Sequence, residues 1–463
     1  MMAVLLYLLL VAVGSLCIVS ASYSDDTADV FAFSHFYMKQ TVWLSVALAA
    51  ALVVLLLDAR FYHMFAYPAY IAGLLFLTIP LFMPAGTNGA KAWIELGAFK
   101  IQPIEFAKIA TALAVARDMS AYSFSITRFG NLFKVAFIIG LPLLIVVLQN
   151  DTGSGIVLGS FLFVFYREGL NNWLCIPVLA VAALFIFSLL LTPLTMLIIL
   201  ILLCTVCDTM MNGRWKMHVK YLASLAFFSI VLYSAVRLLT PWEWSMYASL
   251  LTVTCLSIVA VAVYAYRAAL TNTYIMLLLF VGAMVFLPTS NVLFNSLKQH
   301  QRDRINTFLG LKSDPQGLDY NVNQSKIAIG SGRFWGKGFL EGTQVKYSFV
   351  PEKHTDFIFC TVGEERGFVG CIAVLTLFCL LILRLMRMGD RQVEPFGRIY
   401  CYCVAAILLF HVLVNVGMTI GLMPVMGIPL PLISYGGSSL IAFTILIFIA
   451  IRLDAATRQD TFA

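Results

Sequence analysis

The residues from Trp173 to Cys207, WLCIPVLAVAALFIFSLLLTPLTMLIILILLCTVC, include no charged side chain. A membrane-spanning helix needs about 20 mostly apolar residues, so this stretch is too long for a single crossing. Thr192-Pro193 lies near its middle, and proline interrupts a helix because it lacks the backbone N–H donor. The sequence therefore predicts two consecutive spanning helices, over 172–190 and 193–207.

The composition of the whole chain agrees with a membrane protein. Of its 463 residues, 61% are hydrophobic and 11% are charged, with a mean hydropathy of +0.93. Soluble domains average about 45–50% apolar and about 25% charged residues, so this chain has too few charges to cover a water-exposed surface. A cytosolic enzyme, a disordered scaffold and a secreted disulfide framework are excluded. Most of the ten cysteines lie in apolar runs, where we expect buried structural thiols.

The same length criterion, applied along the chain, predicts an all-α polytopic membrane protein with about fourteen spanning helices. They lie near 3–22, 41–57, 64–83, 102–116, 133–149, 153–167, 172–190, 193–207, 219–238, 246–265, 272–288, 357–383, 399–421 and 436–452. No basic residue precedes the first apolar run, so we expect a retained helix rather than a cleaved signal peptide.

The distribution of Lys and Arg predicts the orientation. With the N-terminus inside, the short inner loops and the tail hold fifteen basic residues, and the short outer loops hold five. Positive charges collect on the cytoplasmic side, so we expect both termini in the cytoplasm.

One polar segment, 289–356, then lies outside the membrane. It contains nine basic and six acidic residues, interleaved with aromatic residues and glycines. Loops of this length in a compact protein are functional or disordered, and the aromatic content favours an ordered loop. Its excess positive charge predicts an anionic substrate such as the phosphates of a lipid head group, although a solvated face would have a similar composition.

Ionisable residues within apolar segments cost about 2.5–3.5 kcal/mol on insertion, so each needs a partner or a purpose. Glu105 and Lys108, in QPIEFAKIATALAVA, share one helix face. Two interpretations stay open for them, a structural ion pair and a pair lining a polar cavity towards the outer leaflet. Asp151, in QNDTGSG, precedes an apolar run, and we favour a helix cap there.

Asp356 lies where the polar loop enters an apolar helix, between PEKHT and FIFCTV. Partial burial and the nearby Glu352 would raise its pKa, whereas Lys346 and Lys353 would lower it. A base at the membrane–water boundary could meet the head group of a lipid substrate. The alternative is a routine N-terminal helix cap.

The glycine-rich run AIGSGRFWGKGFLEGTQ, residues 328–344, does not indicate a nucleotide site. It matches neither GxxxxGK[ST] nor GxGxxG followed by a helix. Glycines at this density are typical of tight turns or of close backbone approach to a ligand.

Several separate blocks resemble the SEDS family (shape, elongation, division, sporulation), represented by RodA and FtsW. In order along the chain they are AKAWIELGAFKIQPIEFAKIA, QNDTGSG, QRDRI, NQSKIAIGSGRFWGKGFLEGTQ, VPEKHTDFIFCTVGEERGFVG and NVGMTIGLMPVMGIPLPLISYGGSSL. The sequence GTQ, residues 342–344, is more similar to RodA-type members than to FtsW-type members. The chain departs from the family pattern at Ile104, Asn150 and Ser348, and Ser348 puts in doubt any role for a carboxylate at that position.

The resemblance implies ten core helices, so about four more form an insertion for which the sequence gives no function. We expect core helices in 1–170 and 357–463, the inserted bundle within 171–288, and the large extracytoplasmic loop in 289–356. Because four is an even number of crossings, the insertion leaves the loop outside.

The resemblance further implies a peptidoglycan glycosyltransferase that polymerises lipid II into glycan strands at the outer face of the bacterial cytoplasmic membrane. Asp356 corresponds to the family's loop aspartate and would deprotonate the acceptor sugar. Lys326 and Lys337 are candidate phosphate contacts, and Glu105 and Lys108 would shape the lipid cavity. The other candidate substrate-binding residues are Glu352, His354, Arg304 and Gln344, and the candidate structural motif comprises Asp151, Pro429, Pro431, Ser434, Tyr435, Gly436 and Gly437.

A divalent cation, Mg²⁺ or Mn²⁺, is expected as a cofactor with ligands that the sequence does not reveal, and no nucleotide is expected. The implied partners are lipid II, the nascent glycan strand, a class B penicillin-binding protein and other membrane proteins of the elongation complex, but no nucleic acid. The alternative function is a lipid II flippase or another polytopic transporter, which would concentrate its polar residues at the bilayer midplane. A non-catalytic scaffold for cell-wall enzymes would not require Asp356.

Overall fold

The computed structural model describes residues 1–22, 36–84, 91–96, 99–122, 124–239, 244–268, 270–311 and 318–462. Part of the predicted loop, 312–317, lies outside the described residues. The chain divides into two compact units, one formed by 1–175 and 304–463 and the other by 176–303.

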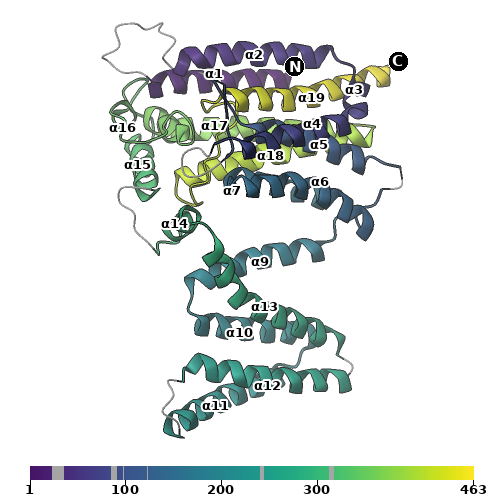
Figure 1. Ribbon diagram of the computed structural model, residues 1–463, viewed down its shortest axis with the longest axis vertical. Helices are drawn as coiled ribbons and strands as arrows, with labels where there is room; N and C mark the ends of the chain where they lie inside the picture. Colours follow the sequence, from purple (N-terminus) through teal and green to yellow (C-terminus); the bar gives the residue numbers. More distant parts are fainter. Residues whose placement is uncertain are drawn as a thin grey trace. The chain divides into compact units, whose positions relative to one another are not determined.

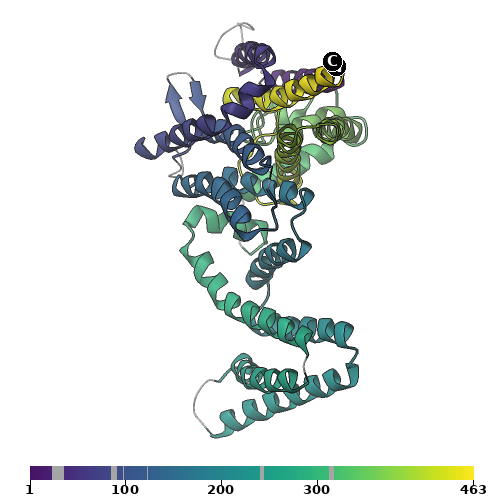
Figure 2. The ribbon, with the colours of Figure 1, turned by 90° about the vertical axis from the view of Figure 1, so that its right-hand side faces the viewer.

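The N-terminal part of the first unit consists mainly of helices (Figure 1). Its elements are α1 (Met2–Ser22), α2 (Phe36–Leu56), α3 (Ala59–Met64), α4 (Ala66–Thr78), the 3₁₀ helix η1 (Ile79–Phe82), β1 (Ile94–Leu96), β2 (Phe99–Ile101), α5 (Pro103–Met119), α6 (Phe129–Leu148), α7 (Thr152–Val157), the 3₁₀ helix η3 (Leu158–Ser160) and α8 (Phe161–Arg167). The sequence did not predict the antiparallel hairpin β1–β2, which projects from the bundle in Figure 2. Its strands are only three residues long, too short for a periodic signal.

The remaining elements complete both units. They are α9 (Asn172–Leu190), α10 (Pro193–Asn212), α11 (Trp215–Leu239), α12 (Met246–Arg267), α13 (Thr271–Ser296), α14 (Gln299–Phe308), α15 (Leu318–Ser331), α16 (Thr343–Lys346), α17 (Ile358–Asp390), α18 (Pro395–Thr419) and α19 (Gly437–Phe462). The break predicted at Thr192-Pro193 separates α9 from α10, and the Thr192 side chain caps α10.

The all-α prediction is confirmed. Among the described residues, ten helices are long and apolar enough to cross a membrane. Each predicted span coincides with helical structure, although several of these helices are too short to be counted among the ten. The structure places helices in the predicted loop as well, because α13 continues past Pro288 to Ser296 and is followed by α14, α15 and α16.

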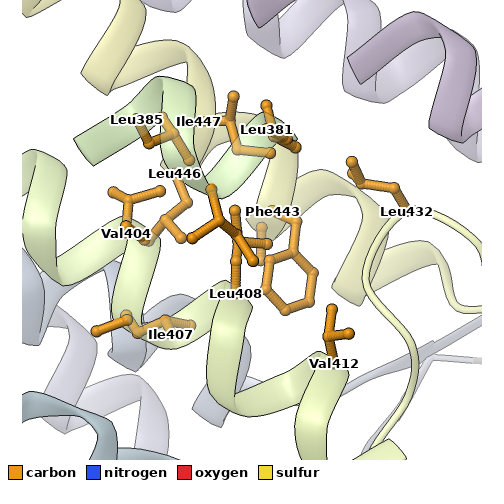
Figure 3. Close-up of a cluster of buried hydrophobic side chains, with 14 of the residues drawn as sticks. Leu381, Leu385, Val404, Ile407, Leu408, Val412, Leu432, Phe443, Leu446 and Ile447 are labelled. Atoms are coloured by element: carbon orange, nitrogen blue, oxygen red, sulfur yellow. The ribbon is translucent and has the colours of Figure 1, made fainter. Parts of the chain in front are cut away.

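The core of the first unit lies among α17, α18 and α19. Figure 3 shows Leu381 and Leu385 of α17, Leu408 of α18 and Phe443 of α19 converging on one another. Helix α5 packs against α18 and α19, α1 packs along α17, and α2 packs along α19. Helices α5 and α18 are buried on most of their surface, so polar residues on them must find partners inside the protein.

Candidate functional site

The segment that enters α17, from Glu352 to Phe357, is a compact turn. The backbone N–H groups of Thr355 and Phe357 both donate to the Glu352 carbonyl oxygen, at 3.1 and 3.2 Å. The N-cap position of α17 is Phe357, and no side-chain hydrogen bond caps the helix there. Asp356 therefore does not act as the helix cap that the sequence allowed as an alternative.

The chain between α18 and α19 fixes this turn from the other side. The Asn415 amide nitrogen donates to the Asp356 carbonyl oxygen at 2.8 Å and to the Ile428 carbonyl oxygen at 2.7 Å. The Ser434 hydroxyl donates to the Thr355 carbonyl oxygen at 2.8 Å. These bonds hold the backbone on which the Asp356 carboxylate is mounted.

His354 packs between aromatic rings. Its imidazole stacks on Phe36 with ring centroids 4.1 Å apart, and Tyr435 lies edge-on at 6.2 Å. The Tyr435 backbone N–H also donates to the His354 carbonyl oxygen at 2.8 Å. Burial lowers the pKa of His354, so the neutral imidazole is favoured.

Charged residues from several distant sequence blocks act on the pKa of the Asp356 carboxyl. Burial raises the pKa of this carboxyl to about 7, and the negative charge of Glu352 adds to the effect. Arg304 opposes the shift, and Asp151 contributes a smaller increase. The side chain also lies beside Gly427, where a Cβ atom would be 3.5 Å from Asp356 Oδ2. Asp151, Arg304 and Glu352 thus lie near enough to act on the charge of Asp356, whereas their roles in catalysis or binding stay predictions.

Asp151 is the predicted helix cap. Its carboxylate accepts from the Ser154 backbone N–H at 3.2 Å, at the start of α7, and from the Gln102 amide at 3.2 Å. Gly153 lies against the carbonyl group of Met426, and a side chain at this glycine would clash with it. This block is therefore tied to the α18–α19 connection that faces Asp356.

Two candidate substrate-binding residues, one of which is the predicted phosphate contact Lys326, line one small cavity. Arg304 on α14 and Lys326 on α15 border a space of about 80 Å³. Four further residues of these two helices and the segment from Gly421 to Val425 complete its lining. The Lys326 side chain lies directly over Gly421, whose φ of 78° and lack of a side chain allow this approach. The cavity therefore presents two positive charges near the turn that carries Asp356.

Lys337 and Gln344 are organised around Glu364, a residue to which the sequence assigned no role. The Glu364 side chain is fully buried and accepts from Lys337 Nζ at 2.6 Å and from the backbone N–H groups of Gln344 and Val345 at 2.8 and 2.9 Å. The Thr343 hydroxyl adds a bond at 3.3 Å. Lys337 does not line the cavity of Arg304 and Lys326. Glu364 lies in GEERG, residues 363–367, within one of the blocks that resemble the SEDS family, and this block was the only sequence signal that could have indicated a role for it.

The neighbouring Glu365 holds the preceding part of the loop, by accepting from the Leu340 backbone N–H at 3.0 Å and from the Ser20 hydroxyl. Helix α17 bends at Gly367, where φ is 62°, and the chain from Phe334 to Gly336 packs into the bend. A side chain at Gly367 would collide with this loop backbone. Loop and helix therefore form one packed structure.

Glu105 and Lys108 form the predicted ion pair, at 2.9 Å and with both side chains 3% exposed. Lys108 Nζ also lies 2.8 Å from His411 Nε2 on α18, and His411 Nδ1 lies 3.3 Å from the Pro429 carbonyl oxygen. This chain links α5 to the C-terminal motif. A role of the pair in shaping a lipid cavity stays a prediction.

The C-terminal motif packs at the start of α19. Pro431 is buried, and the Gly436 carbonyl accepts the first hydrogen bond of α19 from Leu440 at 2.9 Å. Gly437 lies against the Trp43 ring of α2, so a side chain at this position would clash. Of this motif, Ser434 and Tyr435 contact the 352–357 turn, through their hydrogen bonds to the carbonyl oxygens of Thr355 and His354.

The described residues contain no group of three or more His, Cys, Asp and Glu side chains that could hold a metal ion. The predicted cation thus has no cage made only of such side chains in this part of the chain. Magnesium is usually held by one or two carboxylates together with substrate phosphates, so a cation bound mainly by the substrate does not need such a cage.

Comparisons with known proteins agree with the motif blocks. The chain matches the FtsW/RodA/SpoVE model, described as "Cell cycle protein", over residues 1–201 and 194–459. It is 32% identical to the peptidoglycan glycosyltransferase RodA of Treponema pallidum, over 98% of this chain and 97% of that protein. It is 30% identical to the peptidoglycan glycosyltransferase MrdB of Escherichia coli strain K12, over 86% and 80%.

Two solved structures share the fold. A chain of the structure described as "Structural coordination of polymerization and crosslinking by a peptidoglycan synthase complex" has a TM-score of 0.61 at 24% identity, covering 99% of this chain and 98% of its own. The rod shape determining protein RodA of Thermus thermophilus has a TM-score of 0.55 at 22% identity, covering 99% and 97%. The chain is a multi-pass membrane protein that belongs to the FtsW/RodA/SpoVE family of cell cycle proteins.

Proposed function

We propose that this protein is a peptidoglycan glycosyltransferase that polymerises lipid II into glycan strands during cell elongation. Membership in the FtsW/RodA/SpoVE family and the names of the relatives from Treponema pallidum and Escherichia coli support this activity. The observation that carries the proposal is the Asp356 carboxylate, with a pKa raised to about 7, on a turn fixed by the motif between α18 and α19.

Asp356 acts as the general base. A carboxylate with a pKa near the working pH is partly ionised and also basic enough to accept a proton from a sugar hydroxyl. The hydroxyl oxygen of the acceptor attacks the anomeric carbon of the lipid-linked donor as its proton passes to Asp356. The bond from that carbon to the pyrophosphate oxygen breaks, and undecaprenyl pyrophosphate leaves. The leaving group is already a stable anion, so one carboxylate suffices, unlike the pair used by glycosidases.

Arg304 and Lys326 bind the phosphates of the donor. Both line the cavity of about 80 Å³ near the Asp356 turn, and fixed cations there stabilise the charge that develops on the leaving pyrophosphate. A Mg²⁺ or Mn²⁺ ion held by the pyrophosphate oxygens of the donor would neutralise the same charge and would leave Asp356 free to accept the proton.

The reaction takes place at the outer face of the bacterial cytoplasmic membrane, with both termini in the cytoplasm and the 289–356 segment outside. The bias of Lys and Arg supports this orientation. We propose that the polymerase works with a class B penicillin-binding protein and with other membrane proteins of the elongation complex. The likeness in fold to a chain from a peptidoglycan synthase complex is compatible with such an assembly.

The test is a polymerisation assay with purified protein, lipid II and a divalent cation, with the penicillin-binding protein partner added in a parallel series. Asp356→Asn keeps the size of the side chain and removes the base, so we expect no polymer. Glu341→Gln is the matched control, since Glu341 is an exposed carboxylate of the same segment, and it should polymerise like the wild type. Equal product from Asp356→Asn and the wild type would refute the role of Asp356.

The flippase alternative is tested with the same preparations in vesicles. Movement of lipid II across the bilayer by a wild-type protein that forms no polymer with its partner present would favour that alternative. In the structure, the intramembrane charges Glu105 and Lys108 pair with each other in a closed environment, which gives the alternative no specific support.

A further inference from the structure

The inserted bundle contains another, larger cavity, and its lining residues all belong to the unit formed by 176–303. Helices α10, α11, α12 and α13 surround a space of about 830 Å³. This volume is within the range of about 300–1,000 Å³ that is typical of ligand pockets. The walls are mainly apolar, and Phe228, Val231 and Leu256 are exposed at its rim, so the cavity opens towards the side of the bundle.

One end of the cavity is polar. The buried Asp208 carboxylate pairs with His218 Nε2 at 2.6 Å and accepts from Thr273 at 2.9 Å and from Asn212 at 2.8 Å. Thr209 lies 3.0 Å from the other ring nitrogen of His218. Asp208 is therefore held by partners within the bundle, and a ligand at this end does not meet an unpaired carboxylate.

Three cations are grouped at the same end. Arg214 donates to the hydroxyl of Tyr264, a cavity residue, at 2.8 Å. Lys220 follows the cavity residue Met217 by three positions on α11, and Arg267 follows Tyr264 by three positions on α12, so each is a neighbour on the same helix face. Within the described part of the chain, none of these three cations forms an ion pair with a carboxylate.

The apolar part of the cavity has the length of one membrane leaflet. Along α11 it extends from Ser224 to Ala235, which corresponds to roughly 17 Å at 1.5 Å per residue. Half of the hydrocarbon core of a bilayer is about 15 Å. Basic pockets between transmembrane helices on the cytoplasmic side are suited to anionic lipid head groups, and the Lys and Arg distribution puts this end of the bundle on that side.

We propose that the α10–α13 bundle binds an anionic glycerophospholipid of the cytoplasmic leaflet. Its phosphate contacts Arg214, Lys220 and Arg267, and an acyl chain occupies the apolar part of the cavity. The positive charge at one end distinguishes this lipid from a neutral phospholipid, and the length of the apolar part distinguishes it from a longer polyprenyl chain. A lipid that binds only the folded bundle stabilises it by mass action.

The experiment measures lipid binding to the purified full-length protein by native mass spectrometry. Phosphatidylglycerol, phosphatidylcholine with the same acyl chains and undecaprenyl phosphate are added in separate series. We expect phosphatidylglycerol to bind roughly tenfold or more tightly than phosphatidylcholine, because each basic residue near the head group contributes about 1 kcal/mol.

Two pairs of variants locate the site. The double variant R214Q/R267Q should lose the preference for phosphatidylglycerol, whereas Arg237→Gln, which removes a charge at the opposite end of α11, should keep it. Ala260→Phe narrows the cavity without changing a charge and should weaken binding, whereas Val259→Phe, at an exposed position that does not line the cavity, should not.

The proposal is overturned if phosphatidylcholine binds as tightly as phosphatidylglycerol, or if R214Q/R267Q keeps the preference. Tighter binding of undecaprenyl phosphate that Ala260→Phe abolishes would also overturn it and would assign the cavity to a polyprenyl chain. These outcomes do not depend on polymerase activity, so they are separate from those that test Asp356.

Discussion

Replacing Glu364 with alanine is expected to release the segment Gly342–Val345 from α17. The fully buried Glu364 carboxylate accepts hydrogen bonds from Lys337, from two backbone N–H groups of this segment and from the Thr343 hydroxyl. The variant leaves the Lys337 ammonium and the two N–H groups without their acceptor, at the place where the loop joins the helix.

The size of the effect follows from these partners. Each buried donor left unsatisfied costs about 1–3 kcal/mol, and breaking a buried ion pair costs about 3–5 kcal/mol. Lys337 is partly exposed and can regain water, which reduces its share. The two N–H groups and the weakened ion pair together give an expected cost of about 3–5 kcal/mol. Local detachment of the segment relieves this cost, so the loop should open before the helix bundle unfolds.

Hydrogen–deuterium exchange of the full-length protein measures this opening. We expect amides of Gly342–Val345 to exchange at least 100-fold faster in Glu364→Ala than in the wild type, while α18 keeps its protection. Glu364→Gln retains one carbonyl acceptor and should show an intermediate rate. The control is Glu341→Gln, which changes an exposed carboxylate of the same loop and should exchange like the wild type.

Wild-type exchange of this segment in Glu364→Ala would refute the argument, since it would mean that other contacts hold the loop. Equal acceleration of the segment and of α18 would also contradict it, because the change would then be global unfolding rather than local release.

Three further predictions concern the Asp356 turn and its support. The polymerisation rate should rise with pH through about 7 as Asp356 ionises. Glu352→Gln should move this rise to lower pH, because it removes a negative charge that raises the pKa of Asp356. A pH–rate profile of the wild type and of the variant checks both expectations. Asn415→Ala should reduce the turnover number and destabilise the protein by about 1–3 kcal/mol, since two backbone carbonyls lose their donor, and unchanged turnover would contradict this role. Gly437→Ala should lower the thermal stability by about 1–3 kcal/mol through its clash with Trp43, and the double variant with Trp43→Ala should recover part of that loss.

Local sequence patterns predicted most of the fold. Apolar runs of sufficient length mark helices, and proline after Thr192 marks the break between α9 and α10 because both signals act within one segment. Helix ends were less predictable. The predicted span 272–288 stops where the apolar residues stop, but α13 continues to Ser296 because helical hydrogen bonds do not require apolar side chains.

The residues of the candidate site were predicted by their motifs, but the contacts that hold them were not. Asn415 lies in an apolar helix and contacts a residue 59 positions away, and Glu364 reaches a segment about 20 positions away. No spacing rule connects such pairs, because the chain brings them together only when α16, α17 and α18 pack. Glu105 and Lys108 could be paired from the sequence because they lie on one turn of one helix.

Helix α17 provides a common reference for both halves of the site. The Asp356 turn leads directly into its first residue, and Glu364 lies six residues further along, a rise of roughly 9 Å. The base and the loop segment Gly342–Val345 are thus positioned by one rigid element. A variant that releases the loop should lower the rate without moving the pH at which it rises, whereas Glu352→Gln should move that pH with the loop intact. If Glu364→Ala shifted the pH profile as Glu352→Gln does, the loop would act on the charge of Asp356 and not on the position of the substrate.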